Sequence, residues 1–192
     1  MRTLLFITSG FPVSGITEQS FILPELGAIA AQFERVILIP SRIYAGQEIK
    51  DVVLPDNCIV DDRYARGDFN IPKKGEMYAT LLHPAMLKAI LHDKSRLINV
   101  AQLRNMAGFY FEAKKMAKWL EKEWLNKGDN ITIYTFWFHT ATTAAAFLAK
   151  KHDIKIVTRA HGFDVYDDQV EFRSHYFREF TFNKINAVYT CS

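Results

Sequence analysis

Two histidines follow strand-like apolar runs, a position in which an imidazole can meet a ligand. His161 comes just after such a run, with Arg159 two residues before it and Asp164 three residues after it. His139 follows another run in the same way. An imidazole can donate or accept one hydrogen bond, and it can carry charge when a phosphate is near. Residue type alone leaves a ligand-binding histidine and a structural histidine as alternatives.

A loop with two glycines, Gly10 and Gly15, follows the first apolar run of the chain. Glycine lets the backbone approach a ligand, and the N-terminus of the helix expected next favours an anion. The spacing is not that of a dinucleotide-binding fingerprint, and Ser41-Arg42 stands where that fingerprint needs an acidic residue. No Gly-Lys-Ser/Thr follows, so the loop is not a P-loop. It is either a phosphate-facing loop or a tight turn without a ligand.

Other catalytic and metal chemistries have no support in the sequence. Asp167 and Asp168 form a carboxylate pair without a third ligand, and the spacing of Cys58 and Cys191 fits no zinc site. The chain has no G-x-S-x-G motif, and neither cysteine has an obvious histidine partner. We therefore expect no metal, no cofactor and no nucleophilic side chain.

Composition and charge narrow the classes of partner. The chain has 192 residues, 49% of them apolar, and a net charge of +3, which is too small to indicate nucleic acid binding. No apolar run approaches a membrane span, and the N-terminus is too short in apolar residues for a secretory signal, so we expect a cytoplasmic protein. Residues 96–127 hold seven basic side chains against three acidic ones. This excess indicates either a solvated helix face or weak peripheral contact with the inner face of the cell membrane.

Strand-like and helix-like segments alternate along the chain. We expect strands at 3–8, 35–39, 131–138, 154–159 and 187–191, with weaker candidates at 52–54 and 58–60. We expect helices after an N-cap at Thr17 and at 96–126, 140–151 and 171–184, and a loop at 63–75. This alternation predicts an α/β fold: a Rossmann-like, doubly wound, mostly parallel sheet with helices on both faces. Ligands of such sheets bind outside the carboxyl ends of the strands.

Four segments together resemble a known enzyme family. They are 6–15 with the helix after it, 134–138 with the small-residue helix after it, 159–166 (RAHGFDVY) and 172–192. In this order they resemble the N-terminal half of family 4 glycosyltransferases of the bacterial surface-polysaccharide type. The resemblance implies the GT-B fold, in which two Rossmann-like domains face each other across a cleft. It also implies sugar transfer with retention and without a tightly held metal.

The resemblance further implies that acceptor binding and donor binding belong to two different domains. Residues 1–192 would form one acceptor-side domain, and the donor-binding C-terminal domain would be absent from this chain. The partners would be a nucleotide-sugar donor and a glycan or lipid-linked acceptor, and the chain alone would be inactive. His161 would be the catalytic residue, and substrate would be bound by Gly10, Phe11, Gly15, His139, Arg159, Gly162 and Asp164. The alternative is a stand-alone Rossmann-like module that binds a nucleotide or a phosphosugar.

Overall fold

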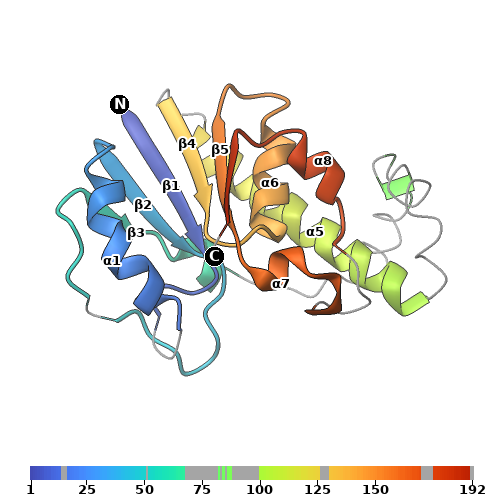
Figure 1. The fold of residues 1–192 in the computed structure, drawn as a ribbon, viewed down its shortest axis with the longest axis horizontal. Helices are drawn as coiled ribbons and strands as arrows, with labels where there is room; N and C mark the ends of the chain where they lie inside the picture. Colours follow the sequence, from blue (N-terminus) through green and yellow to red (C-terminus); the bar gives the residue numbers. More distant parts are fainter. Residues whose placement is uncertain are drawn as a thin grey trace.

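The computed structural model describes residues 1–13, 17–50, 52–67, 82, 84, 86–87, 100–125, 130–169 and 175–190. A six-stranded sheet in the order β3-β2-β1-β4-β5-β6 forms its centre, and every pair of neighbouring strands is parallel (Figure 1). The strand order reverses between β1 and β4, as it does in Rossmann-like doubly wound sheets. The predicted fold class is confirmed. The strands are β1 (Arg2–Thr8), β2 (Arg35–Pro40), β3 (Cys58–Val60), β4 (Asn130–Thr135), β5 (Lys155–Ala160) and β6 (Ala187–Thr190).

The apolar runs form strands because both faces of the sheet are covered. Leu4 and Phe6 of β1 pack in the cluster under α1 (Gln19–Ala30). Leu5 and Ile7 point to the opposite face, where they pack with α5 (Val100–Glu123) and α6 (Thr140–Leu148). Figure 1 shows α1 beside β2 and β3, with α5 and α6 on the other side of the sheet. The period-2 alternation of side chains therefore gives each helix layer its own apolar core.

Several strands and helices begin or end at residues other than the predicted ones. The strand expected at 131–138 ends at Thr135, and residues 136–139 form bends, although the Phe136 N–H still donates to the Ile7 carbonyl of β1. The N-cap of α1 is Glu18 rather than Thr17, and Pro24 lies inside the helix. Of the candidates at 52–54 and 58–60 only the second is a strand, and the expected loop at 63–75 contains the short helix α2 (Arg63–Arg66). In the described part of 171–184, only α8 (Arg178–Phe182) is helical.

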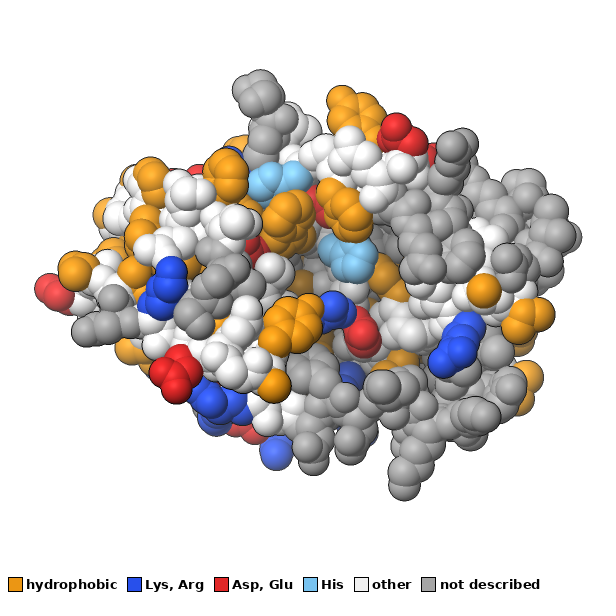
Figure 2. Space-filling model, turned by 90° about the horizontal axis from the view of Figure 1, so that it is seen from below, with side chains coloured by type: hydrophobic (Ala, Val, Ile, Leu, Met, Phe, Trp, Pro, Cys, Tyr) orange, Lys and Arg blue, Asp and Glu red, His pale blue; other side chains and the backbone are white. Residues whose placement is uncertain are grey.

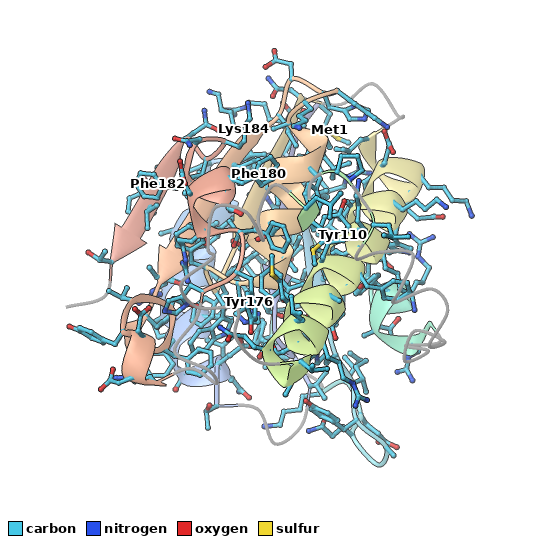
Figure 3. The ribbon with its side chains drawn as sticks, turned by 90° about the vertical axis from the view of Figure 1, so that its right-hand side faces the viewer. Met1, Tyr110, Tyr176, Phe180, Phe182 and Lys184 are labelled. Carbon is cyan, nitrogen blue, oxygen red and sulfur yellow. The ribbon has the colours of Figure 1, made fainter. Side chains whose placement is uncertain are left out.

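An aromatic cluster holds the segment before α8 against α5. Tyr110 and Tyr176 are buried there, and the Tyr176 hydroxyl donates to the backbone carbonyl of Gln102 at 3.3 Å. Figure 3 shows both tyrosines lying between α5 and the C-terminal segments, whereas Phe182 points away from them. The cluster thereby positions the start of α8, and α8 itself packs beside α6. Among the described helices, α5 included, none combines the length and apolar character that a membrane span requires.

Candidate functional site

Two adjoining cavities form a cleft at the carboxyl ends of the strands. Figure 2 shows this face, with histidine and hydrophobic side chains gathered around a hollow. The first cavity, of about 460 Å³, lies between the ends of β1 and β2, α5 and the start of α6. The second cavity, of about 570 Å³, lies between α5, α6 and residues 175–181. The cavities are next to each other, since five residues line both of them: Arg42, Glu112, His139, Thr140 and Phe163.

A carboxylate of the chain itself fills the loop after β1. The backbone N–H groups of Ser9, Gly10 and Phe11 donate to the Glu18 carboxylate at 3.0, 2.9 and 3.0 Å. The indole N–H of Trp137 donates to the same carboxylate, and Glu18 is only 3% exposed. Successive N–H groups that point into a concavity are a common phosphate site. Here they are already satisfied, so the loop does not offer these donors to a diphosphate.

Three predicted binding residues are in or near this loop. Gly10 contributes its N–H to Glu18, as described above. The Phe11 side chain is 1% exposed and belongs to the core beneath α1, and it lines neither cavity, so its role in substrate binding stays a prediction. Gly15 lies outside the described residues. Of the two alternatives that the sequence left open, the structure thus favours the tight turn, whose acceptor is the internal carboxylate of Glu18.

His161 lies behind the wall of the first cavity. Its Nε2 is 3.1 Å from the Phe136 carbonyl oxygen. A carbonyl only accepts, so this bond requires the proton on Nε2. The ring also stacks on Trp137, with the centroids 4.2 Å apart. His161 lines neither cavity, whereas Trp137 lines the first one. The predicted catalytic residue is therefore held in one orientation next to the cleft, with Trp137 in front of it.

Arg159 and Gly162 are engaged inside the chain. Arg159 Nη1 donates to both carboxylate oxygens of Glu25 at 2.9 and 3.0 Å, which ties β5 to α1. A Cβ added to Gly162 would meet Gln169 at 3.4 Å and Tyr166 at 3.5 Å, which are ordinary contacts. The space beside Gly162, which we expected a ligand to need, is taken by these two side chains. Neither residue lines the cleft.

His139 lies at the junction of the two cavities, as the strand-end rule predicts. Its Nδ1 is 2.9 Å from the Thr140 hydroxyl, and its ring meets Phe109 edge-on at 5.1 Å. Partial desolvation by the cleft walls and the positive charges of Arg42 and Arg178 lower the pKa of His139 to about 4, although the side chain is exposed to solvent in the cleft. The imidazole is therefore neutral at neutral pH, where it can donate and accept one hydrogen bond each.

Asp164 connects the His161 turn to α8 through the short helix α7 (Gly162–Val165). Its Oδ2 accepts the backbone N–H of His161 at 3.0 Å, and the side chain is 2% exposed at the wall of the first cavity. Burial raises the pKa of Asp164, although nearby N–H groups and Arg178 oppose this effect. The backbone carbonyl of Asp164 accepts Arg178 Nη2 at 2.7 Å. Asp164 thus orders the wall between the cavities.

Two arginines complete the cleft, and the sequence analysis assigned neither to the site. Arg42 follows β2 and pairs with Glu112 of α5 at 3.1 Å, so applying the strand-end rule to β2 could have found it. Arg178 stacks on the Phe138 ring at 3.9 Å and donates to His175 Nδ1 at 2.8 Å. It belongs to no recognisable motif, and local periodicity does not encode its contacts with Phe138, Asp164 and His175.

Comparisons with known proteins give no assignment. No family model, no curated protein and no solved structure matches this chain. Function is therefore inferred from the cleft and from the motifs. Within the described ranges, no group of three His, Cys, Asp or Glu side chains is placed to hold a metal ion. The candidate carboxylate pair, Asp167 and Asp168, lies in the short 3-10 helix η2 (Asp167–Gln169). The candidate thiol of Cys58 is buried, and burial raises its pKa.

Proposed function

We propose that this chain is the acceptor-side half of a retaining glycosyltransferase, which moves a sugar from a nucleotide sugar to a glycan or lipid-linked acceptor. The observation that carries the proposal is the cleft of two adjoining cavities at the strand-order reversal of a Rossmann-like sheet. Open parallel sheets bind their ligands at this place. The motif RAHGFDVY, on which the family resemblance rests, builds the wall of the first cavity through Asp164.

The cleft has the side chains that a sugar needs. Aromatic rings of Phe109, Phe163 and Tyr176 offer flat apolar surfaces for the C–H faces of a pyranose. Hydroxyl and amide groups of Thr143 and Asn105 offer hydrogen-bond partners for its hydroxyls. Such a mixture of apolar walls with a few polar groups is typical of small-molecule sites. We propose that the acceptor lies here and presents its hydroxyl toward the neutral imidazole of His139.

The role proposed for His161 is electrostatic. In glycosyl transfer the sugar becomes oxocarbenium-like while negative charge grows on the leaving diphosphate, and fixed dipoles or donors stabilise that charge. The hydrogen bond to Phe136 and the stacking on Trp137 hold the ring in a fixed orientation, which a catalytic group needs. The diphosphate itself is assigned to the second domain, because the N–H groups of the first loop are bound to Glu18.

The activity is tested on the natural protein that contains this chain, with a panel of nucleotide sugars and lipid-linked acceptors. We expect sugar transfer with retention by the whole protein and none by residues 1–192 alone, because one half cannot enclose the donor and exclude water. Robust transfer by the 192-residue chain would refute the two-domain proposal. Nucleotide or phosphosugar binding without any transfer by the whole protein would favour the stand-alone binding module.

The role of His161 is tested with His161→Ala and His161→Gln in the same protein. If the imidazole stabilises charge that develops in the transition state, kcat falls by about 10²–10³ in both variants. If it is only a structural partner of Phe136 and Trp137, both variants lose about 1–3 kcal/mol of stability instead. Near-normal kcat together with a melting midpoint several degrees lower would show that His161 is structural.

A further inference from the structure

We propose that the second cavity binds an oxyanion, a phosphate or carboxylate group, that is carried by a sugar. This inference specifies the acceptor of the function proposed above and rests on it. The two residues that would hold the anion are Arg178, at the start of α8, and Arg104, on the facing side of α5. The acceptor sugar would then be a charged one.

Arg178 is a half-buried cation, and the nearby carboxylates of Asp164 and Asp167 act on its charge without forming an ion pair with it. Its Nη2 donates to a backbone carbonyl and to a neutral ring nitrogen, those of Asp164 and His175, at 2.7 and 2.8 Å. No carboxylate of a described residue forms an ion pair with its guanidinium. Burial disfavours the charged form and lowers the pKa of Arg178, although the group stays charged. A charge kept at such a cost on a cavity wall indicates an anionic ligand.

Arg104 provides the second positive group. It is exposed, it lines the second cavity, and it makes no hydrogen bond or ion pair with any described residue. The third arginine of this lining, Arg42, differs from both because Glu112 pairs with it at 3.1 Å. Glu112 is the only acidic side chain among the described residues of the lining. The described lining therefore holds three cations and one anion, and the carboxylates of Asp164 and Asp167 offset part of the Arg178 charge from outside it.

The shape of the cavity favours an anion attached to a sugar over a free ion. A volume of about 570 Å³ exceeds what one phosphate needs and lies in the range of small-molecule sites. The aromatic side chains of Phe109, Phe163 and Tyr176 stand beside the cationic groups. Arginine binds phosphate and carboxylate through two parallel N–H groups, whereas the aromatic rings suit the apolar face of a pyranose. Sugar phosphates and uronic acids both have this chemistry.

A structural role for Arg178 is the rival explanation. In that case the guanidinium only clamps α8 to the Asp164 carbonyl and to the Phe138 ring, and the unsubstituted chain would not discriminate between charged and neutral sugars. Variants at Arg104 would then have no effect on binding either, because Arg104 takes no part in that clamp. Binding measurements therefore separate the two roles even where Arg178 also contributes to folding.

The test is calorimetric titration of the 192-residue chain with four probes at constant ionic strength: glucose, glucose 1-phosphate, glucuronate and inorganic phosphate. We expect at least one of the two charged sugars to bind about tenfold or more tightly than both glucose and inorganic phosphate. The charged sugar that binds more tightly identifies the source of the anion. Equal binding of glucose and both charged sugars, or inorganic phosphate binding as tightly as they do, would overturn the proposal.

Substitutions at Arg104 and Arg178 test whether these two residues bind the anion. Arg104→Gln and Arg178→Gln should each weaken binding of the charged sugar by about 10–100-fold. Lys118→Gln is the matched control, because Lys118 is an exposed cation of α5 outside the cavity lining, and it should leave binding unchanged. If Arg178→Gln fails to fold, Arg178→Lys replaces it because it keeps the positive charge. Arg178→Lys should retain more binding of the charged sugar than Arg104→Gln does. Unchanged binding in Arg104→Gln would contradict the site.

The proposed function and this inference can fail separately. If the natural protein transfers no sugar but the chain binds glucose 1-phosphate through Arg104 and Arg178, the transferase proposal fails and the anion site stands. If the protein transfers sugar but the chain binds glucose as tightly as the charged sugars, the transferase stands and the anion site fails.

Discussion

The loop after β1 and the wall formed by α8 both present positive groups to a concave surface, but they meet negative charge in different ways. In the loop, three backbone N–H groups and the Trp137 indole surround the Glu18 carboxylate. At the wall, the guanidinium of Arg178 meets a carbonyl and a neutral imidazole instead. One anion site is filled by the chain itself, whereas the other is open to the cleft.

This difference indicates that the loop after β1 has a structural role and that Arg178 is available for ligand binding. Buried donors that have a partner inside the chain contribute to stability, because leaving them unpaired costs free energy. A half-buried cation without such a partner contributes little to stability and can be retained for a ligand. The motif that looked most like a ligand loop in the sequence is therefore the structural one. The arginine without any motif is the better candidate for ligand binding.

The largest expected effect comes from removing the internal anion. Glu18→Ala should lower the free energy of unfolding by about 3–5 kcal/mol, because it leaves three backbone N–H groups, those of Gly10 and Phe11 buried, without an acceptor. Glu18→Gln is the control that keeps one acceptor oxygen, and it should cost about half as much. Urea unfolding of the two variants and the unsubstituted chain measures both values. A loss below about 1 kcal/mol in Glu18→Ala would show that the loop does not depend on this carboxylate.

An arginine that does have a carboxylate partner sharpens the contrast. Arg63 donates to both oxygens of Asp61 at 2.8 and 2.7 Å, and Asp61 is 8% exposed. Arg63→Gln should cost about 1–2 kcal/mol near neutral pH, a value reduced by solvent screening because 55% of the Arg63 side chain is exposed. Arg178→Gln should cost less in the same urea experiment. A larger loss for Arg178→Gln would reverse the comparison.

The cost of Arg63→Gln should also depend on pH. Burial by itself would raise the pKa of Asp61, but the hydrogen bonds and charge of Arg63 outweigh it and lower that pKa. A lowered carboxyl pKa stabilises the fold above the ordinary aspartate value of about 4, and this contribution is lost as the pH falls through the folded-state pKa. The difference between Arg63→Gln and the unsubstituted chain should therefore shrink as the pH falls below about 4. A difference that stays constant would contradict the pairing.

A smaller effect is expected at His139, which faces both cavities. Its pKa of about 4 results from partial desolvation and from the charges of Arg42 and Arg178, so an anion bound in the second cavity should raise it. The expected rise with glucose 1-phosphate is about half a unit to one unit. NMR titration of the ring protons measures it, with His152, which lies beside Glu121 away from the cleft, as the internal reference. An unchanged midpoint at saturating ligand would place the anion elsewhere.

The smallest effect concerns the membrane contact predicted for residues 96–127. Met106 and Tyr110 of this segment are buried, so any contact would depend on exposed basic side chains such as Lys118 and Lys122. Each basic residue near an anionic surface contributes about 1 kcal/mol, so binding should be weak and sensitive to salt. Liposome sedimentation at low and high salt measures it. Equal binding to neutral and anionic vesicles, or no binding to either, would remove the membrane contact.

The sequence was informative where one local rule decides the structure. The apolar run at 3–8 forms a strand that is buried on both faces, and the strand-end rule placed His139 and Asp164 at the cleft. It was not informative where partners come from distant segments. Glu18 folds back onto a loop seven to nine residues before it, and Arg178 reaches the cleft through tertiary contacts with Asp164 and Phe138. Residue spacing does not encode either arrangement.

The most direct test of the central claim is to map glucose 1-phosphate on the 192-residue chain by amide chemical shifts. We expect shifts that saturate at the amides of Arg104, Thr143 and Arg178, which line the second cavity. The amides of Ser9, Gly10 and Phe11 should not move, because Glu18 already occupies their hydrogen bonds. Saturating shifts at Ser9–Phe11 without shifts around Arg178 would contradict the claim, since they would show that the anion enters the loop and not the second cavity.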